Sequence, residues 1–528
     1  MTEDYEFILI GSGAAGSTIA KELLQTNSNT SILILEAGPE VSARDRRHWW
    51  DYVVLDVKPY AFCYDQPGEY KTSGNVNWDF RENRVMAYGG STLHWGGWSL
   101  RFKPEDFRLF TNTKQGVDWP FDYDHLEKFY CRAESFLSVC GDDAEDWQMR
   151  RSAPFPMPPF DWTAADGEMI EGFYKCGIKP GKMPLARYRR CMTTGTCKYC
   201  PLGSRYTSQH VLDDLLKEGF KNLKVLRNSP VKSLVVQSKK ELVDGVIFID
   251  GKTGEEKLVT GKTVVVCSGT YESPKLLLTS QNTFWSKGIG NDYDQVGHYI
   301  VSHSMLKVTG ETQKNAEHWS QEYDFPTLMS RSYDTPEFQE KGKLFLFKDR
   351  VKPNVDFARL MISGKTRTEI DEVVSGPRRS ELQAFLEEKG KYQNHLKVIN
   401  RKNRFGLYHT EVSFSRTKEE NENAQARLKL LEKVIEKMNY KIVYSKVEDP
   451  GGHHATGTCR MHRDAKLGVV DANLLVHGTD NLYVCSNAAL PTCSAVNPTL
   501  TLTAMAMRLA DHFVETHKLK AEKAAVNA

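Results

Sequence analysis

The chain has 528 residues, of which 40% are hydrophobic and 26% are charged, and its formal net charge is +2 at pH 7. A chain of this length is too long for a single hydrophobic core of ordinary size, so we expect two or three domains, or one large α/β domain with a second domain inserted into it. The near-neutral charge does not favour a nucleic-acid or membrane surface. No stretch approaches about 18 uninterrupted apolar residues, so no membrane span is predicted.

The first residues, MTEDYEFILIGSG, lack a basic leader followed by an apolar segment and a cleavage site. A cytoplasmic location with mostly free thiols is the simple expectation. The alternative is a periplasmic location, reached by export of the folded protein together with a partner subunit that carries the signal.

The first predicted element is a buried strand that runs into a glycine turn and a helix. Residues 6–24 read EFILIGSGAAGSTIAKELL, and residues 31–38, SILILEAG, supply the second strand of a βαβ unit. The turn fits Gly-x-Gly-x-x-Gly, a weak pattern alone, because about 0.2 chance matches are expected in such a chain. Its place between a strand and a helix, with Glu36 after the second strand, predicts a dinucleotide site.

Each part of this turn has a physical role. Gly11 permits the tight turn, Gly13 lets the backbone approach a pyrophosphate, and Gly16 allows close packing of helix on strand. The helix N-terminus offers unpaired N–H groups to the phosphates, and Glu36 can accept hydrogen bonds from ribose hydroxyls. The turn alone does not distinguish NAD from FAD.

The composition and periodicity of the sequence change several times along the middle of the chain. Residues 45–85 lack periodicity and predict a long ordered loop, and residues 89–102, GGSTLHWGGWSLRF, are glycine-rich and aromatic. The proline-rich residues 150–162 indicate a boundary with another lobe. Strand patterns return at 221–236 and at 262–280, where the strand runs into a helix. Short strands and charged helices follow, and an amphipathic helix closes the chain.

Five ordered motifs carry a resemblance to a known family. The glycine turn is followed by GGSTLHWGG, CSGTYESPKLLLTS, HHATGTCRM and SNAALPTCSAVNPTLTLTAMAMRLAD. Together they resemble the glucose–methanol–choline (GMC) family of FAD-dependent oxidoreductases. The resemblance runs from Tyr5 to about His512 and is weakest over 111–189 and 301–440. GGSTLHWGG and the following SLRFKPEDF are most similar to a bacterial sugar dehydrogenase branch, with glucoside 3-dehydrogenases, FAD glucose dehydrogenases and gluconate dehydrogenase flavin subunits.

The resemblance implies an α/β fold with two domains. One is a discontinuous Rossmann-like FAD-binding domain, and the other is an α+β substrate-binding domain built on an antiparallel sheet. We expect the first to comprise residues 1–110, 190–300 and 455–528, and the second to comprise 111–189 and 301–454. The cofactor-binding residues that it implies are Gly11, Gly13, Ala14, Ala15, Gly16, Glu36, Gly89, Gly90, Ser91, His94, Val231, Asn487, Pro498 and Thr499.

The family's catalytic histidine matches His454, with His453 as the adjacent alternative. An alcohol donates hydride poorly until its O–H proton is removed, and a neutral histidine is a suitable base. The family's second catalytic position, His or Asn, matches Asn497. An amide cannot act as the base, but Asn497 can hold the substrate oxygen and orient the C–H bond toward the flavin. It can also cap the closing helix.

Two other motif positions carry weaker expectations. In some relatives a histidine at the place of His94 is joined covalently to the flavin, and in others it only packs against the ring, which we favour here. Trp95 and Trp98 favour a stacked wall beside the flavin in either case. The pair Ser486-Asn487 departs from the Asp-Gly or Asp-Ala of many relatives, so side-chain roles there are not carried over.

Three cysteines, Cys191, Cys197 and Cys200, lie within ten positions. Surplus thiols, a zinc site or disulfide, and an iron–sulfur cluster are the three explanations. Zinc needs a fourth ligand, and the nearest histidine is His210. The resemblance to the bacterial branch implies that the three cysteines bind a three-iron cluster. In that branch the cysteine loop is followed by Cys-Pro-x-Gly. Such a cluster would relay single electrons to an acceptor such as a cytochrome c.

We therefore expect an FAD-dependent sugar dehydrogenase that oxidises a secondary hydroxyl of a pyranose, with a possible small companion subunit. His454 would take the hydroxyl proton as hydride moves to flavin N5. C3 of a glucoside, giving a 3-keto sugar, is the first choice, and C1 of glucose or C2 of gluconate follows. The alternatives are a pyranose oxidase that uses dioxygen and a non-catalytic flavin-binding scaffold or sensor. Without a cluster, dioxygen or a quinone becomes the more credible acceptor.

Overall fold

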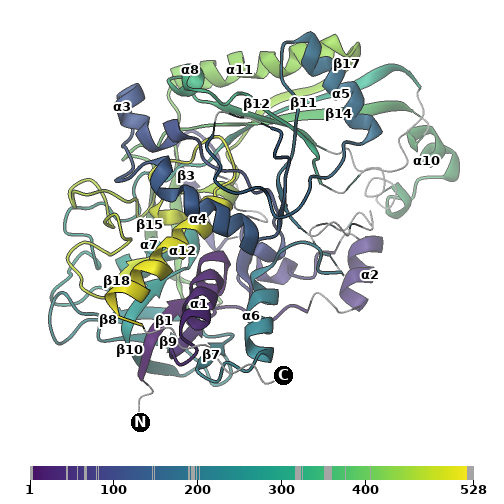
Figure 1. Cartoon of the computed structure of the whole chain (residues 1–528). Coiled ribbons are helices and arrows are strands. Elements are labelled where there is room, and N and C mark those ends of the chain that lie inside the picture. The colour runs from purple at the N-terminus through teal and green to yellow at the C-terminus, as the bar shows by residue number, and fades with distance from the viewer. Residues whose placement is uncertain are drawn as a thin grey trace.

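Two large sheets organise the chain, one mostly parallel at the bottom of Figure 1 and one antiparallel at its top. The computed structural model describes residues 4–42, 46–55, 57–64, 68–78, 80, 83–145, 147, 149–187, 191, 197, 199–200, 202–315, 323, 325–349, 360–374, 376–404 and 406–519.

The first sheet begins with the predicted βαβ unit. Its order is β7-β2-β1-β10-β9-β8, and β18 also pairs with β10. The pairs β1–β2, β1–β10, β2–β7 and β10–β18 are parallel, whereas β9 runs antiparallel to both β8 and β10. Strand β2 and residues 7–10 of β1 are continuous, buried apolar runs, as expected for strands that are covered on both faces. The strands are β1 (Asp4–Ile10), β2 (Ile32–Leu35), β7 (Leu223–Leu226), β8 (Val231–Val235), β9 (Gly245–Ile249), β10 (Glu256–Val266) and β18 (Leu482–Val484).

Helices from distant parts of the sequence pack beside this sheet. Helix α1 (Ala14–Thr26) lies against α12 (Thr499–Thr516), and α12 lies against α4 (Tyr123–Phe136) (Figure 1). Helix α6 (Ser208–Lys217) packs on α1, and α7 (Gly269–Thr279) contacts β8. The buried face of α12 carries small and large apolar side chains in alternation, which lets it approach α1 closely.

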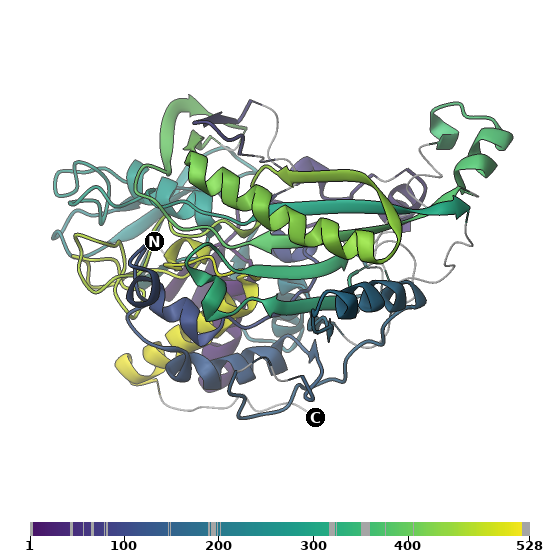
Figure 2. The ribbon, with the colours of Figure 1, turned by 90° about the horizontal axis from the view of Figure 1, so that it is seen from above.

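The second sheet is antiparallel, with the order β17-β11-β14-β13-β12-β5. Helix α11 (Lys418–Lys437) lies over it beside α5 (Ala164–Lys175) (Figure 2). The side chain of Thr417 accepts a hydrogen bond from the Glu420 amide at the start of α11, and Glu420 bonds back, which forms a capping box. The strands are β5 (Gly181–Lys182), β11 (Ser304–Asn315), β12 (Leu328–Tyr333), β13 (Leu344–Asp349), β14 (Pro377–Leu386) and β17 (Tyr440–Glu448).

Two smaller sheets and several short helices complete the described fold. β16 (Tyr408–Ser413) pairs with both β15 (His395–Lys402) and β3 (Tyr70–Ser73), and β4 (Val139–Cys140) pairs with β6 (Leu185–Ala186). The short helices are α2 (Arg46–Leu55), η1 (Ala61–Cys63), η2 (Gly90–Leu93), η3 (Pro104–Arg108), α3 (Leu109–Thr113), α8 (Pro336–Gln339), α10 (Arg367–Val374), η4 (Gly452–His454) and η5 (Asn487–Ala489). None of the helices in the described ranges is long and apolar enough to cross a lipid bilayer.

The α/β fold with a second, antiparallel sheet agrees with the prediction. The predicted long loop at 45–85 instead contains α2 and β3. Several contacts cross the predicted domain limits: β3 pairs with β16, α4 packs on α12, and α7 contacts β15. The domain boundaries therefore stay a prediction, with residues near 70 and 123–136 as the places to test them.

Candidate active site

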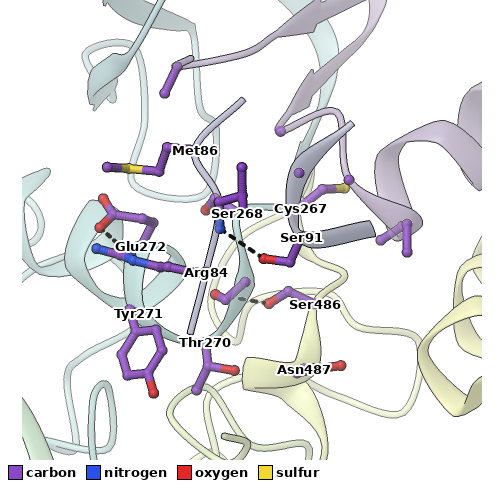
Figure 3. A pocket seen from close by; sticks show the side chains of 18 of the residues that line it. Arg84, Met86, Ser91, Cys267, Ser268, Thr270, Tyr271, Glu272, Ser486 and Asn487 are labelled. Carbon is purple, nitrogen blue, oxygen red and sulfur yellow. Dashed lines mark hydrogen bonds and ion pairs between the residues drawn. The ribbon is translucent and has the colours of Figure 1, made fainter. Parts of the chain in front are cut away.

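A cavity of about 390 Å³ lies where β1 and β2 of the first sheet end, at Ile10 and Leu35. Its lining comes from the β1–α1 turn, residues 83–98, the start of α7, the β15–β16 hairpin, η4, and the start of α12 (Figure 3). The glycine turn and the two predicted catalytic residues therefore line one cavity, although they lie at opposite ends of the sequence.

The glycine turn has the geometry that its sequence predicts. Gly11 has φ +111°, and a Cβ there would lie 2.8 Å from the Cys267 carbonyl oxygen. A Cβ on Gly16 would lie 2.1 Å from the Gly11 carbonyl oxygen, so only glycine allows this approach of α1 to the turn. A Cβ on Gly13 would meet no atom within 4 Å, because this position faces the cavity. The N-terminus of α1 therefore opens onto free space, as a phosphate site requires.

Glu36 joins this turn to the end of β2. Its Oε2 accepts hydrogen bonds from the Ser12 hydroxyl at 2.5 Å and the Ser12 amide at 3.1 Å, and its Oε1 accepts one from the Gly38 amide at 2.9 Å. Burial raises the pKa of Glu36, and these hydrogen bonds oppose that rise. The carboxylate lines the cavity, where the predicted contact with ribose hydroxyls is sterically open.

The charges around the cavity suit an anionic dinucleotide. Glu272 pairs with Arg84 at 2.7 Å (Figure 3) and with Lys275 at 2.6 Å. Burial alone would raise the pKa of Glu272, but Lys275 and Arg84 bring it down to about 2. Glu272 is therefore ionised and paired. A surplus of cations over carboxylates favours a pyrophosphate. The cationic lining residues are Arg84, Lys232, Lys275 and Lys402, against the carboxylates Glu36 and Glu272.

Asn487 supplies a further polar group for a bound cofactor. It begins η5, whose N-cap is Ser486, and the Ser486 hydroxyl accepts a hydrogen bond from the Ala488 amide at 3.3 Å. The Asn487 Oδ1 atom is buried, lines the cavity and has no hydrogen-bond partner in the described protein. Because a buried orphan acceptor is costly, it fits a donor from a bound molecule. The described residues thus fit FAD, whose bound form is not part of this structure.

Most predicted cofactor-binding residues line the cavity, and three do not. Gly16 packs inside the α1 turn, the Gly89 amide donates to the Ser12 hydroxyl at 2.9 Å, and Pro498 is the N-cap residue of α12. These three residues position neighbours rather than face the open space. Those in the lining are Gly11, Gly13, Ala14, Ala15, Glu36, Gly90, Ser91, His94, Val231, Asn487 and Thr499.

The two predicted catalytic residues meet at the other end of the cavity. His454 Nε2 lies 2.8 Å from Asn497 Nδ2, and both side chains line the cavity. His454 ends η4, which is fixed by the Ser302 hydroxyl donating to the Gly451 carbonyl at 2.7 Å. Burial lowers the pKa of His454 well below its usual value, and His303 and His453 lower it further. The imidazole is therefore neutral near pH 7.

The adjacent His453 also lines the cavity, but its side chain is exposed. The hydrogen bond to Asn497 belongs to His454. This hydrogen bond distinguishes His454 from His453 as the candidate base, a distinction that motif position alone does not make.

The backbone after His454 is tied to the start of α7. Pro274 lies inside α7 and cannot donate to the Thr270 carbonyl, one helical turn earlier. The Thr458 hydroxyl donates to that carbonyl instead, at 2.6 Å, and the Thr270 hydroxyl bonds to the Ala455 carbonyl. The proline therefore frees an acceptor that holds the segment carrying the histidine.

His94 lies beside the cavity, next to an aromatic wall. Its Nδ1 is 3.2 Å from the Tyr64 hydroxyl, and its ring is buried. Trp95 donates its indole N–H to the Tyr206 carbonyl at 2.9 Å, and Trp98 lies edge-on to Phe347 at 4.6 Å. The aromatic wall is present. Covalent attachment of flavin to His94 stays a prediction.

The three clustered cysteines do not form the predicted metal centre. In the described ranges, which include Cys191, Cys197 and Cys200, no three His, Cys, Asp or Glu side chains are arranged to hold a metal ion. Arg187 instead donates to Cys197 Sγ at 3.0 Å. Burial would raise the pKa of Cys200, but hydrogen bonds from Ser204 and Leu202 bring it below its usual value. The described donor set therefore does not support the iron–sulfur cluster.

Four functional candidates escaped the sequence analysis. Arg84, Glu272 and Lys402 line the cavity, and His303 contacts His454, its Nδ1 lying 3.1 Å from the other Nδ1. Arg84 and Lys402 lie outside the five motifs, and Glu272 lies inside one of them without having been assigned a role there. His303 precedes β11, inside the region where the resemblance is weakest. Only tertiary contacts identify these residues.

Comparison with known proteins agrees with this geometry. Residues 5–305 and 394–506 match the GMC oxidoreductase family. The chain is 24% identical to the fructose dehydrogenase large subunit of Gluconobacter japonicus, over 96% of this chain and 97% of that protein. It is 25% identical to the 6'''-hydroxyparomomycin C oxidase of Streptomyces lividus, over 96% and 90%.

A solved structure shares the fold. The crystal structure of pyridoxine 4-oxidase from Mesorbium loti superposes with a TM-score of 0.69 at 16% identity, and the match covers 97% of this chain and 99% of that one. Together with the family match, this confirms the predicted fold class, a Rossmann-like FAD-binding fold. The chain belongs to the GMC oxidoreductase family, and it is an FAD-dependent enzyme that acts on CH–OH groups.

Proposed function

We propose that this protein is a sugar dehydrogenase that oxidises a secondary hydroxyl of a pyranose, with His454 as the base and Asn497 as the group that holds the substrate oxygen. Bound FAD would accept the hydride from the carbinol carbon. C3 of a glucoside is the carbon that we favour, and this choice rests on the sequence resemblance to the glucoside 3-dehydrogenase branch.

One observation carries the proposal: His454 Nε2 and Asn497 Nδ2 lie 2.8 Å apart in the cavity that also holds the glycine turn. Asn497 Oδ1 is buried without a hydrogen-bond partner in the described residues, so the pair presents an imidazole nitrogen and a free carbonyl oxygen. A hydroxyl group entering here can give its proton to Nε2. The Nδ2–H group of Asn497 can donate to the same oxygen and thereby fix the direction of the C–H bond.

Three features support a carbohydrate substrate. The indole of Trp98 lines the cavity and is backed by Phe347 at 4.6 Å and Phe385 at 5.8 Å. A flat aromatic surface beside a few fixed polar groups suits a ring with one apolar face and many hydroxyls. The fructose dehydrogenase large subunit, by its name, acts on a sugar and matches this chain along nearly its whole length.

The electron acceptor is the second part of the proposal. We favour a one-electron acceptor such as a cytochrome c, reached with the help of a small companion subunit, because one relative is the large subunit of a dehydrogenase. No relay through Cys191, Cys197 and Cys200 is proposed, since their surroundings do not fit a metal centre. Dioxygen is the competing acceptor, which the similarity to an oxidase favours.

The test is anaerobic mixing of the purified holoprotein with D-glucose, methyl α-D-glucoside, D-gluconate and D-fructose. Loss of the visible flavin band with methyl α-D-glucoside, and a 3-keto product identified by NMR, is the expected result. Bleaching by glucose or gluconate alone would move oxidation to C1 or C2. If no sugar or polyol bleached the visible flavin band, the proposal that the protein is a sugar dehydrogenase would be contradicted. Hydrogen peroxide formed in proportion to sugar consumed in air would identify an oxidase.

A further inference from the structure

A second histidine, His303, contacts the imidazole of His454. The inference from this contact rests on the proposed function, because it concerns the same catalytic imidazole. Both ring nitrogens of His454 have a neighbour: Nε2 lies 2.8 Å from Asn497 Nδ2, and Nδ1 lies 3.1 Å from His303 Nδ1. One of the two Nδ1 atoms must carry the hydrogen of this contact, and which of them carries it determines the tautomer of both rings.

The far side of His303 fixes that choice. Its Nε2 lies 3.2 Å from the Cys493 carbonyl oxygen and 3.1 Å from the Ser494 carbonyl oxygen. A carbonyl only accepts hydrogen bonds, so Nε2 of His303 must carry a proton. Burial lowers the pKa of His303 to about 4, so the ring is neutral near pH 7. A neutral imidazole has one N–H, and Nδ1 of His303 is therefore an acceptor.

The proton between the two rings then belongs to His454. Its Nδ1 donates to His303, and its Nε2 keeps a lone pair that faces Asn497 and the cavity. Asn497 Nδ2 is a donor, so it matches an unprotonated Nε2. We propose that His303 is a positioning residue that holds His454 in the Nδ1–H tautomer, so that Nε2 is unprotonated and can take the proton of a substrate hydroxyl that replaces the Asn497 amide as its partner.

Aromatic packing fixes the orientation of both rings. Phe385 stacks on His303 with centroids 5.0 Å apart and planes at 19°, and it meets His454 edge-on at 5.1 Å and 81°. One side chain of β14 therefore limits the rotation of both imidazoles. A flip of either ring would break the Nδ1–Nδ1 contact.

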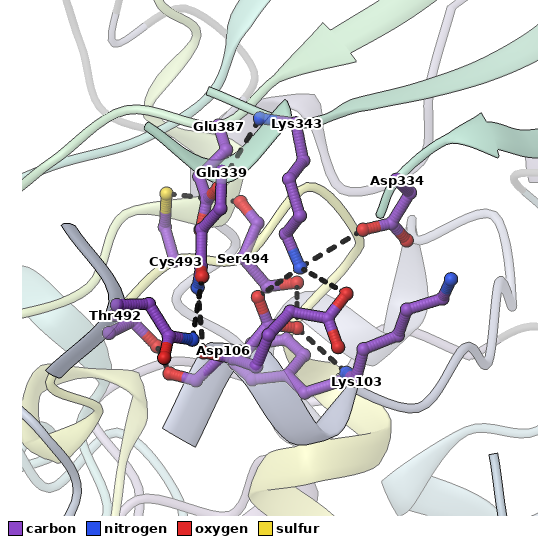
Figure 4. A network of polar contacts seen from close by, with 12 residues as sticks. Lys103, Asp106, Asp334, Gln339, Lys343, Glu387, Thr492, Cys493 and Ser494 are labelled. Carbon is purple, nitrogen blue, oxygen red and sulfur yellow. Dashed lines mark hydrogen bonds and ion pairs between the residues drawn. The ribbon is translucent and has the colours of Figure 1, made fainter. Parts of the chain in front are cut away.

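The carbonyls that hold His303 are themselves held by a buried charge network (Figure 4). Ser494 has φ +55°, which is unfavourable for a residue with a Cβ. Its hydroxyl donates to Asp106 Oδ2 at 2.7 Å. Asp106 forms an ion pair with Lys343, which also lies 3.0 Å from Asp334. Lys343, Asp106 and Asp334 are fully buried. This anchor keeps the 493–494 carbonyls aimed at His303.

Burial keeps both rings neutral, although one charged neighbour, Asp334, raises the pKa of His303. His454 faces His303 and His453, and Asp334 is the carboxylate that acts on His303. A proton on His303 would place a cation beside the base and remove the acceptor of its Nδ1–H. Both effects would turn the base off.

The decisive variants are His303→Asn and His303→Gln. By bond count, the asparagine amide reaches the place of Nδ1 and can accept from His454, whereas the glutamine amide reaches the place of Nε2 and keeps only the bond to the carbonyls. At saturating sugar, anaerobic flavin bleaching should slow by at least about 10-fold in His303→Gln. It should recover in His303→Asn, with KM and FAD content close to those of the parent in both.

A measurement without substrate keeps this inference apart from the proposed function. In long-range ¹H–¹⁵N spectra of the ¹⁵N-histidine-labelled holoprotein, the signals lost in His454→Ala identify His454. We expect a protonated Nδ1 and an unprotonated Nε2 on His454 in the parent protein. In His303→Gln, part of the population should show the opposite tautomer. A protonated Nε2 in the parent, or equal bleaching rates in the Gln and Asn variants, would overturn the role of His303. Undiminished bleaching in His454→Ala would instead refute the proposed base itself.

Discussion

The two ends of the cavity are built in different ways. At the nucleotide end, Gly11 and Gly16 belong to one turn, and the Ser12 and Gly38 amides bind Glu36 within a single βαβ unit. At the catalytic end, the contacts of His454 come from separate segments. The first end is encoded locally, and the second exists only when distant segments pack together.

The difference predicts two classes of mutational effect. Changes at the glycine turn act on folding and on cofactor retention, because the backbone itself is the binding surface. Changes around His454 act on the rate of flavin bleaching, because the cavity there is lined by side chains that can be shortened without unfolding the protein. A variant that mixes the two effects would show that the ends are not separate.

The largest effect is expected for Gly16→Ala. The added Cβ would lie 2.1 Å from the Gly11 carbonyl oxygen, and neither piece of backbone can move without separating α1 from β1. We expect protein without bound flavin, and a thermal unfolding midpoint lowered by several degrees. Gly13→Ala is the matched control: it meets no protein atom within 4 Å, so it should fold normally but bind FAD more weakly. Wild-type flavin content in Gly16→Ala would contradict this packing argument.

A pair of asparagines sharpens the comparison. Asn497→Ala removes the amide beside His454 and should slow flavin bleaching by about 10²–10³-fold, as loss of a transition-state hydrogen-bond donor does, with FAD retained. Asn487→Ala removes an orphan acceptor at the cofactor end and should lower FAD affinity while leaving the bleaching rate at saturating FAD nearly unchanged. Stopped-flow traces and flavin titrations measure both. The reverse pattern would place the two amides at the wrong ends.

A smaller effect is expected in the pH dependence of stability. Burial lowers the pKa of His303 from its usual 6.5 to about 4. Between these values the unfolded chain binds a proton that the folded chain does not, so stability falls as the pH falls, by about 1.4 kcal/mol per unit. From pH 7 to pH 5, urea unfolding of the FAD-saturated wild type should lose about 2 kcal/mol more than that of His303→Asn. Equal losses would mean that His303 titrates normally.

The sequence predicted the nucleotide end well because its information is contiguous. The strand, the glycine spacing and Glu36 follow one another, and each has a local physical role. His454 and Asn497 were predicted through resemblance, and the structure places them in contact. The tautomer of His454 could not be predicted, since it depends on His303 and on carbonyls of residues 493–494.

The misinterpreted parts have a common cause. Three closely spaced cysteines suggested a metal centre, but spacing does not say which way thiols point, and Cys197 lies against Arg187 instead. The segment 45–85 lacks periodicity and yet contains α2 and β3. Its buried aromatic side chains are divided between two small clusters, with Tyr52, Tyr60 and Tyr64 in one and Trp78 and Phe80 in the other, so no regular pattern marks its elements.

One measurement tests the central claim, that an imidazole and an amide from distant segments act together beside the cofactor. Single-turnover anaerobic bleaching should be followed for wild type, His454→Ala and His453→Ala, with the sugar that bleaches the wild type fastest. We predict that His454→Ala keeps its FAD and slows by about 10²–10⁴-fold, and that His453→Ala slows far less. Wild-type bleaching in His454→Ala, or a larger loss in His453→Ala, would contradict the account.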